Sequence, residues 1–227
     1  MKYAVMGSGK TGQAVIDMLP KEDIIAICNT KNPVTKEKLV GADVGIVFIP
    51  GKAMDELMPI MMEIDMPLVI GTTGYDWPQD LDAHLKSKGK TWVLGQNFSI
   101  GLNVMRYYSE RLKRSLEALI PEKVNTGIVE IHHVHKLDAP SGTSIYIAES
   151  LNFPKADIKS LREGDAKGTH TVSFTLPYDS VSITHEAQSR AAFAEGVVMA
   201  CARICELPSG LHRFEKLADS LIEAANR

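Results

Sequence analysis

A dense group of ionisable side chains lies just past the middle of the chain. Three of its seven histidines fall within four positions, His132, His133 and His135, and Lys136 follows directly. Histidine exchanges protons near neutral pH, and a lysine beside it adds positive charge for an anionic substrate. The segment therefore predicts proton transfer to a bound anion, with purely structural histidines as the alternative. No metal is expected, because a lysine is a poor neighbour for a cation and no cysteine or Asp/Glu pair completes a tetrahedral ligand set.

A candidate anion-binding segment follows at once, Asp138-Ala139-Pro140-Ser141-Gly142-Thr143. A proline near a helix start, with serine, glycine and threonine around it, is typical of a helix N-terminus, where N–H groups and the helix dipole attract anions. Gly142 removes side-chain bulk, and the hydroxyls of Ser141 and Thr143 add donors. An ordinary helix cap would look the same in isolation. Next to the His/Lys cluster, however, the segment predicts a cradle for a carboxylate.

A glycine-rich turn near the N-terminus is typical of a dinucleotide-binding loop. It reads Gly7-Ser8-Gly9-Lys10-Thr11-Gly12 and lies between an expected strand and an expected helix. In such a loop Gly7 permits the tight turn, Gly9 lets the backbone approach a pyrophosphate, and Gly12 permits close helix–strand packing. A turn without a ligand is the alternative. A nucleoside-triphosphate P-loop is excluded, because Ala4 stands where that motif needs its first glycine.

The end of the second expected strand bears on cofactor preference. A carboxylate that holds a ribose 2′-hydroxyl is expected about 20 residues after the glycine turn. The residues there are Cys28-Asn29-Thr30-Lys31, without an acid. Lys31 is able to meet a 2′-phosphate, which favours NADP, whereas a lysine that is merely solvated is the alternative.

Two further loops follow expected strands at the edge where open α/β sheets bind ligands. Their residues are Gly71-Thr72-Thr73-Gly74 and Gly95-Gln96-Asn97-Phe98-Ser99. Each alone is an ordinary turn. Together with the glycine turn they predict one ligand-binding crevice.

The first hundred residues alternate between strands and helices. The expected strands are apolar throughout, which indicates a parallel sheet covered on both faces. Strands are expected at 2–6, 24–28, 44–49, 68–70 and 91–94, and helices at 13–19, 54–64 and 81–87.

The rhythm changes after Gly101 to a mixed α+β pattern, which predicts a smaller sheet with helices on one side. Helices are expected at 102–119, 140–151, 191–206 and 214–225, and strands at 124–134, 169–176 and 181–187. Side chains alternate between the two faces of a strand. This alternation allows His132 and Lys136 to face a common site, with His133 and His135 on the other face, unless the strand bends.

The composition is that of an ordinary globular protein, with 44% hydrophobic and 23% charged residues among 227. Lys and Arg total 25 against 28 Asp and Glu, a net charge of -3, so no basic field favours nucleic acid. Three scattered cysteines indicate a reducing compartment. No apolar run approaches the roughly 18 residues of a membrane span, and the N-terminus lacks a signal-peptide pattern. These features predict a soluble cytoplasmic protein.

The histidine segment resembles the signature of the 4-hydroxy-tetrahydrodipicolinate reductase family, also called dihydrodipicolinate reductases. Residues Glu130–Thr143 match its pattern E-x-H-H-x-H-K-x-D-A-P-S-G-T completely. Departures are Lys10-Thr11, where the family usually has Arg-Met, and Val47-Phe48-Ile49-Pro50, where an Asp and a Thr are usual. The resemblance covers nearly the whole chain and also includes Gly71–Gly74, Asn97–Gly101, Arg162–Gly164, Gly168–His170, Ile183–His185, Ser189-Arg190 and Phe193–Gly196.

The resemblance implies an NADPH- or NADH-dependent reduction of a cyclic dicarboxylate to tetrahydrodipicolinate, in diaminopimelate and lysine biosynthesis. It makes His132 a proton donor and acceptor and Lys136 a proton donor. It assigns the substrate carboxylates to His133 and to the segment Ser141-Gly142-Thr143. The cofactor would lie along residues 7–12, 71–73 and 95–98.

The resemblance also implies an architecture. A Rossmann-type parallel-sheet domain would comprise residues 1–101 plus 191–227. An inserted α+β domain, 102–190, would bind substrate and form a homotetramer through its sheet. The alternatives are another two-domain NAD(P)-dependent dehydrogenase of an amino-acid pathway, or a dinucleotide sensor without catalysis. The intact His132 and Lys136 speak against a sensor, which needs no proton donor.

Overall fold

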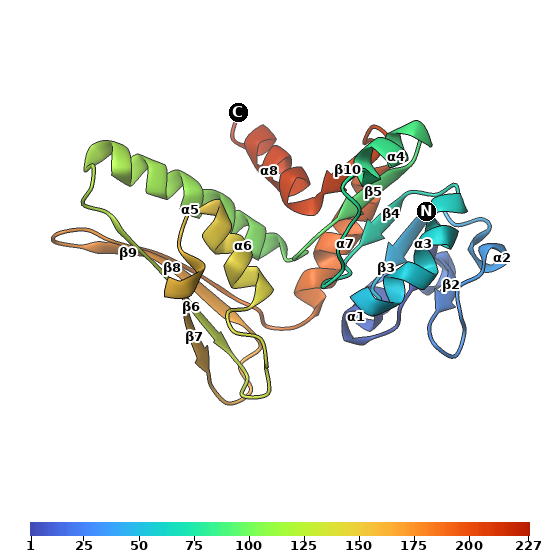
Figure 1. The fold of residues 1–227 in the computed structure, drawn as a ribbon, viewed down its shortest axis with the longest axis horizontal. Helices are drawn as coiled ribbons and strands as arrows, with labels where there is room; N and C mark the ends of the chain where they lie inside the picture. The colour runs from blue at the N-terminus through green and yellow to red at the C-terminus, as the bar shows by residue number, and fades with distance from the viewer. The chain divides into compact units, whose positions relative to one another are not determined.

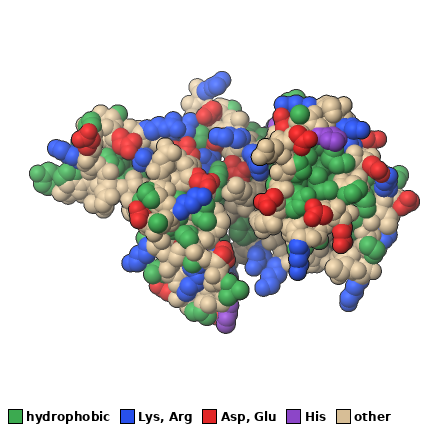
Figure 2. Space-filling model, in the orientation of Figure 1, with side chains coloured by type: hydrophobic (Ala, Val, Ile, Leu, Met, Phe, Trp, Pro, Cys, Tyr) green, Lys and Arg blue, Asp and Glu red, His purple; other side chains and the backbone are tan.

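The computed structural model describes all 227 residues and divides into two compact units (Figure 1). Unit 1 comprises Met1–Ile100 and Arg190–Arg227, and unit 2 comprises Gly101–Ser189. On the face shown in Figure 2, acidic and basic side chains are interspersed. None of the helices combines the length and the apolar character that crossing a bilayer demands.

Unit 1 is built on a six-stranded sheet whose neighbouring strands all pair in parallel, which confirms the predicted α/β class. The strand order is β10-β5-β4-β3-β1-β2. The strands are β1 (Tyr3–Met6), β2 (Ile24–Cys28), β3 (Val44–Val47), β4 (Leu68–Ile70), β5 (Thr91–Leu94) and β10 (Gly210–Arg213). Strand β10 was not predicted, because Gly-Leu-His-Arg has no apolar run of its own.

Helices cover both faces of this sheet, so each face has its own core. Met6 of β1 packs in one core with Met61, whereas its neighbour Val5 packs in the other with Val15 and Val197. The alternation of adjacent strand residues between two cores explains why these strands are apolar throughout. The helices are α1 (Lys10–Met18), α2 (Lys36–Leu39), α3 (Met54–Glu63), α4 (Leu81–Ser87), α7 (Ala191–Ile204) and α8 (Phe214–Ala225), with short 3-10 turns at Lys21–Asp23 and Gly51–Ala53.

Unit 2 is a four-stranded sheet in the order β7-β6-β8-β9. Its apolar face, with Ile128 and Phe174, packs against Leu102 of α5 and Ile147 of α6, so both helices contact one face of the sheet. Strand β6 pairs with β7 in parallel and with β8 antiparallel, and β8 pairs with β9 antiparallel. The elements are α5 (Ile100–Leu119), β6 (Asn125–His132), α6 (Gly142–Ser150), a 3-10 turn (Lys155–Asp157), β7 (Lys159–Arg162), β8 (Thr169–Thr175) and β9 (Ser180–Glu186).

Two element boundaries that bear on function differ from the prediction. Helix α1 begins at Lys10, directly after Gly9, rather than at Gln13, so the glycine turn runs into the helix without a spacer. Strand β6 ends at His132 rather than at residue 134, and the chain then turns. Strand alternation therefore does not extend to Lys136, and the predicted sharing of a strand face by His132 and Lys136 is wrong. A loop positions Lys136 instead.

Candidate active site

Unit 1 holds a pocket of about 710 Å³ at the carboxyl ends of its strands. Its lining includes the whole Gly7–Gly12 loop, residues that follow β2 and β3, and Gly71 and Thr73 after β4. This edge is where open parallel sheets bind ligands, because the loops diverge there and helix N-termini point at the crevice.

The three glycines of the loop have different surroundings. Gly7 has a φ of 105°, and a Cβ there would lie 2.2 Å from the carbonyl oxygen of Phe48. A Cβ on Gly12 would lie 2.0 Å from the carbonyl oxygen of Gly7. A Cβ on Gly9, by contrast, would meet no atom within 4 Å, and Gly9 is the N-cap of α1 with no side-chain cap. The space at Gly9, in front of the first N–H groups of a helix, fits a pyrophosphate.

The loop after β2 is built around Asn29, which stands where an acid was expected. Its Oδ1 accepts hydrogen bonds from the backbone N–H groups of Lys31 and Asn32, both at 3.0 Å. Its Nδ2 donates to Ser8 Oγ at 3.1 Å, which ties this loop to the glycine turn. Lys31 itself is exposed at the tip of the loop. Thr72 is buried, between the pocket-lining residues Gly71 and Thr73.

The loop after β5 is held by a residue to which the sequence assigned no role. Glu215, at the start of α8 and 5% exposed, accepts a hydrogen bond from the backbone N–H of Gln96 at 2.7 Å. Asn97 Oδ1 accepts from the N–H of Ser99 at 2.8 Å. The ring of Phe98 packs in the core, its centroid 4.6 Å from that of Phe214. In the predicted stretch Gly95–Phe98, this aromatic side chain therefore belongs to the core.

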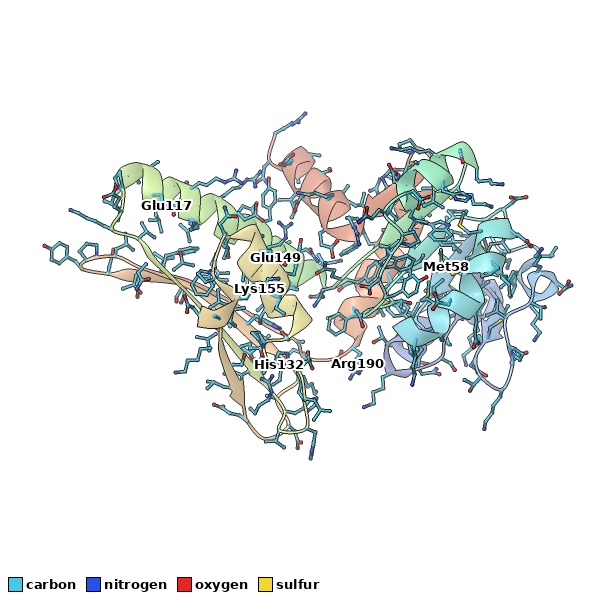
Figure 3. All side chains as sticks on the ribbon, viewed as in Figure 1. Met58, Glu117, His132, Glu149, Lys155 and Arg190 are labelled. Atoms are coloured by element: carbon cyan, nitrogen blue, oxygen red, sulfur yellow. The ribbon has the colours of Figure 1, made fainter.

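In unit 2 the apolar face of the sheet gives way to a polar corner where β6 ends. Glu130 and His132 continue the buried face of β6, and His170 continues that of β8. The strand register places Glu130 opposite His170, His170 opposite His185, and His132 beside Arg162 of β7. His132 lies at the end of its strand in Figure 3. A buried polar cluster at the edge of an apolar core marks this corner as a candidate site.

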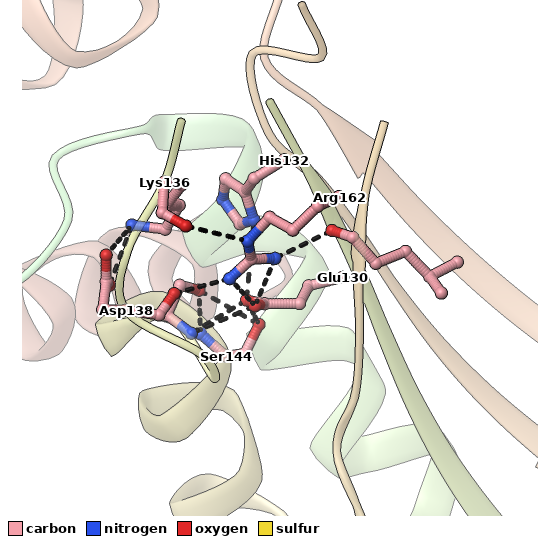
Figure 4. A network of polar contacts seen from close by, with 8 residues as sticks. Glu130, His132, Lys136, Asp138, Ser144 and Arg162 are labelled. Atoms are coloured by element: carbon pink, nitrogen blue, oxygen red, sulfur yellow. Dashed lines mark hydrogen bonds and ion pairs between the residues drawn. The ribbon is translucent and has the colours of Figure 1, made fainter. Parts of the chain in front are cut away.

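Glu130 is the centre of the cluster drawn in Figure 4. It has no exposed surface. Its Oε2 accepts hydrogen bonds from Ser144 Oγ at 2.7 Å and from the N–H of Ser141 at 3.0 Å. Its Oε1 lies 3.3 Å from both terminal nitrogens of Arg162. Burial alone would raise the pKa of Glu130, but hydrogen bonds from Ser141 and Ser144 lower this pKa to about 2. The carboxylate is therefore ionised throughout the physiological pH range.

The loop that carries Lys136 is fastened at its backbone. Arg162 donates from Nε to the carbonyl oxygen of Lys136 at 3.2 Å and from a terminal nitrogen to that of Asp138 at 2.5 Å. The Lys136 ammonium lies 2.8 Å from both carboxylate oxygens of Asp138. Burial would raise the pKa of Asp138, but the hydrogen bond from Lys136 outweighs it and holds the pKa below its usual value.

The two buried imidazoles of the corner, His132 and His170, are kept neutral. His132 is 8% exposed, and burial lowers its pKa, with the neighbouring Glu130 acting in the opposite direction. Its Nδ1 has no hydrogen-bond partner and lies 3.7 Å from Glu130 Oε2. His170, with its ring centroid 5.2 Å from that of His132, has a pKa lowered by burial to about 4. A neutral His132 beside an ionised carboxylate is arranged to take up and release a proton.

The predicted anion cradle lies at the N-terminus of α6. Ser141 is its N-cap, and Ser141 Oγ accepts a hydrogen bond from the N–H of Ser144 at 3.2 Å. A Cβ on Gly142 would meet no atom within 4 Å, which leaves open space for a ligand there. His133 lies in the turn after β6, its ring centroid 6.2 Å from that of His135. Thr143 occupies the first turn of the helix.

Glu130, His132 and His170 also each offer one potential metal-ligand atom, all within 4.8 Å of one another. Both oxygens of Glu130 already accept hydrogen bonds, and the Arg162 guanidinium lies against the carboxylate. A positive charge in this position disfavours a second cation. The assignment of this site without a metal stays a prediction.

The titration of His170 makes a testable prediction about stability. The unfolded chain protonates this histidine below about pH 6.5, whereas the folded chain does so only below about pH 4. Stability present above pH 6.5 is therefore lost as the pH falls towards 4. Between pH 7 and 5, we expect His170 to contribute a loss of about 2 kcal/mol in the free energy of unfolding. Urea denaturation of the full-length chain at both pH values measures this loss, and H170L should remove it; an equal loss in H170L would refute the assignment.

A parallel sheet with an open glycine-rich pocket at the carboxyl ends of its strands is typical of dinucleotide-binding proteins, and a second unit with a buried cluster of ionisable side chains accompanies it here. A family model described as "Dihydrodipicolinate reductase, C-terminus" matches residues 101–217. The chain belongs to the 4-hydroxy-tetrahydrodipicolinate reductase family.

Individual relatives agree with this membership. The 4-hydroxy-tetrahydrodipicolinate reductase of Christiangramia forsetii is 31% identical over 219 residues, which cover 88% of this chain and 90% of that protein. That of Xanthomonas axonopodis pv. citri is 34% identical over 177 residues, which cover 77% and 72%. The fold is shared with a solved structure of dipicolinate-bound dihydrodipicolinate reductase from Paenisporosarcina sp. TG-14, with a TM-score of 0.77, 20% identity, and coverage of 95% of this chain and 98% of that one.

Proposed function

We propose that this chain reduces 4-hydroxy-tetrahydrodipicolinate to tetrahydrodipicolinate with NAD(P)H, in diaminopimelate and lysine biosynthesis. The observation that carries the proposal, beyond family membership, is the corner of unit 2. There a buried histidine and a helix N-terminus lie at one ionised carboxylate, and Arg162 joins the same carboxylate to the loop that carries Lys136. Unit 1 holds the dinucleotide and unit 2 holds the substrate.

The reaction adds one hydride and one proton to 4-hydroxy-tetrahydrodipicolinate and releases its 4-hydroxyl group as water. The dinucleotide, held by Gly7–Gly12 and by the loops after β4 and β5, supplies the hydride when bound. The chain supplies the proton. Lys136 donates it from Nζ, and His132, with Nδ1 facing Glu130, exchanges a proton at Nε2. Ser141, Gly142, Thr143 and His133 hold the substrate carboxylates.

NADPH is the preferred cofactor in this proposal. Asn29 stands where a carboxylate would hold the ribose 2′-hydroxyl of NADH, and its amide is committed to the turn and to Ser8. Lys31, exposed beside it, is available to a 2′-phosphate. We expect K31A to raise the KM for NADPH about tenfold, which corresponds to one lost charge-assisted contact, and to leave the KM for NADH unchanged.

Steady-state kinetics with both cofactors measures this difference. K88A removes a lysine that is exposed at the end of α4, and should change neither KM. Equal effects of K31A on both cofactors would show that Lys31 does not read the 2′-phosphate.

The reaction itself is tested by following NADPH and NADH oxidation with substrate generated in place from pyruvate and aspartate semialdehyde. Turnover with either cofactor is the expected result. Dinucleotide binding without turnover would contradict the reductase proposal. It would favour a dehydrogenase that acts on another dicarboxylate, or a sensor without catalysis.

We also propose that the protein is cytoplasmic and assembles as a homotetramer through unit 2. The face of β8 and β9 opposite the helices carries Thr171, half-buried, and Thr184, exposed, joined at 2.9 Å. Assembly would cover this face of the sheet. Sedimentation equilibrium measures the mass, and a monomer at micromolar concentration would contradict the assembly.

A further inference from the structure

We propose that Glu130 and Arg162 are positioning residues for the proton-transfer step, a buried ion pair that holds His132, the Lys136 loop and the N-terminus of α6 in one working arrangement. The inference rests on the proposed reductase function. In this assignment neither residue contacts the substrate or the cofactor, so both act through His132, Lys136 and the N-terminus of α6.

Glu130 connects His132 to the N-terminus of α6. It lies on β6 two residues before His132, on the same face of the strand, with Oε2 3.7 Å from His132 Nδ1. The same carboxylate accepts hydrogen bonds from the N–H of Ser141 and from Ser144 Oγ, which fix the first turn of α6. One buried carboxylate thus sets both the histidine and the helix N-terminus that is proposed to receive the substrate carboxylate.

Arg162 connects the loop that carries Lys136 to Glu130. Its guanidinium lies against Glu130 Oε1 and at the same time donates to the carbonyl oxygens of Lys136 and Asp138. A guanidinium presents several donors in a fixed plane, so it can hold two carbonyl groups and one carboxylate together. A lysine at this position would keep the charge but lose this planar array of donors.

The charge of Glu130 has a consequence for His132 beyond its position. The charged and titratable groups near His132 are Glu130 on β6, Lys136 and Asp138 on the loop, Arg162 on β7 and His170 on β8. Burial and the two cations disfavour protonation of His132, and Glu130 is the leading influence in its favour. Nδ1 is the ring nitrogen that faces Glu130, so in this inference the proton of the neutral ring lies on Nδ1, which leaves Nε2 to exchange a proton.

An ion pair that serves only folding would make the same contacts, so the test separates the effect of position from the effect of charge. E130Q keeps the shape and removes the charge beside His132. R162K keeps the charge and removes the guanidinium contacts to the Lys136 loop. Both variants are compared with wild type by the pH profile of kcat, by NADPH affinity, and by an NMR titration of the histidine ring nitrogens.

For E130Q we expect kcat to fall about a hundredfold and the pKa of His132, read by NMR, to fall by about one unit, because an opposite charge within a few ångströms is lost. For R162K we expect a comparable loss of kcat/KM with the pH profile unmoved. NADPH affinity should stay at the wild-type value in both, since unit 1 binds the cofactor.

Three results would overturn the inference. The first is a pKa of His132 that does not change in E130Q, and the second is a wild-type rate in either variant. The third is a variant that loses NADPH affinity and no longer unfolds cooperatively, in parallel with its loss of activity. The NMR titration needs no turnover, so it still decides the role of Glu130 if the wild-type protein fails to reduce the proposed substrate. Failure of the wild-type assay alone would count against the proposed function only.

Discussion

Replacing Lys136 by alanine is expected to lower kcat by about a thousandfold and to leave NADPH affinity unchanged. A positioned general acid contributes about 10²- to 10⁴-fold to a proton-transfer step, and the ammonium of Lys136 is assigned that role. Stopped-flow and steady-state measurements of NADPH oxidation give kcat, and fluorescence titration gives the cofactor affinity. A rate within a few-fold of wild type would remove Lys136 from the mechanism.

The structure allows a loss of chemistry to be separated from a loss of structure at this position. The Lys136 side chain contacts Asp138, whose side chain is 59% exposed, and such exposed pairs contribute only about 0–1 kcal/mol to stability. D138N breaks the same pair but keeps the ammonium, so it should retain far more activity than K136A. Equal losses in the two variants would assign the effect to the ion pair rather than to the proton donor.

Strands could be predicted from the sequence wherever they were apolar throughout and bounded by glycine or proline. Strands β1 and β4 meet these conditions because the sheet buries both of their faces. Strands β7 and β10, Lys-Ser-Leu-Arg and Gly-Leu-His-Arg, do not, since both lie at an edge of a sheet. Their conformation depends on hydrogen bonds to the neighbouring strand, which no local pattern reports.

In the candidate site, too, local features could be predicted from the sequence, whereas contacts between strands could not. The glycine turn and the cap of α6 are local structures, so their residue types and spacing predicted them. Glu130, Arg162 and His170 come together through the pairing of β6 with β7 and β8, across up to 40 positions of sequence. All three lie within segments that match the family, yet without the register no role could be assigned. The loop at Lys136 was missed because periodicity cannot show where a strand ends.

Replacing Gly9 by valine is expected to weaken NADPH binding at least a hundredfold while the protein still folds. The backbone of Gly9 has φ -69° and ψ -174°, an extended conformation that valine adopts readily. No atom lies within 4 Å of the added Cβ, so the side chain fits the folded chain but fills the space proposed for the pyrophosphate. Isothermal titration calorimetry with NADPH and a thermal unfolding curve measure the two effects.

The matched variant is G12A, in the same loop and with a smaller added side chain. Its Cβ would lie 2.0 Å from the carbonyl oxygen of Gly7, so α1 must move away from the turn. We expect this crowding to lower the free energy of unfolding by about 2 kcal/mol, more than the helix propensity of alanine restores. If G9V instead destabilised the fold as much as G12A, or bound NADPH like wild type, the open space at Gly9 would not be the pyrophosphate site. If G9V loses NADPH binding but keeps its fold, Gly9 serves the ligand. If G12A loses stability instead, Gly12 serves the packing of α1 against the turn.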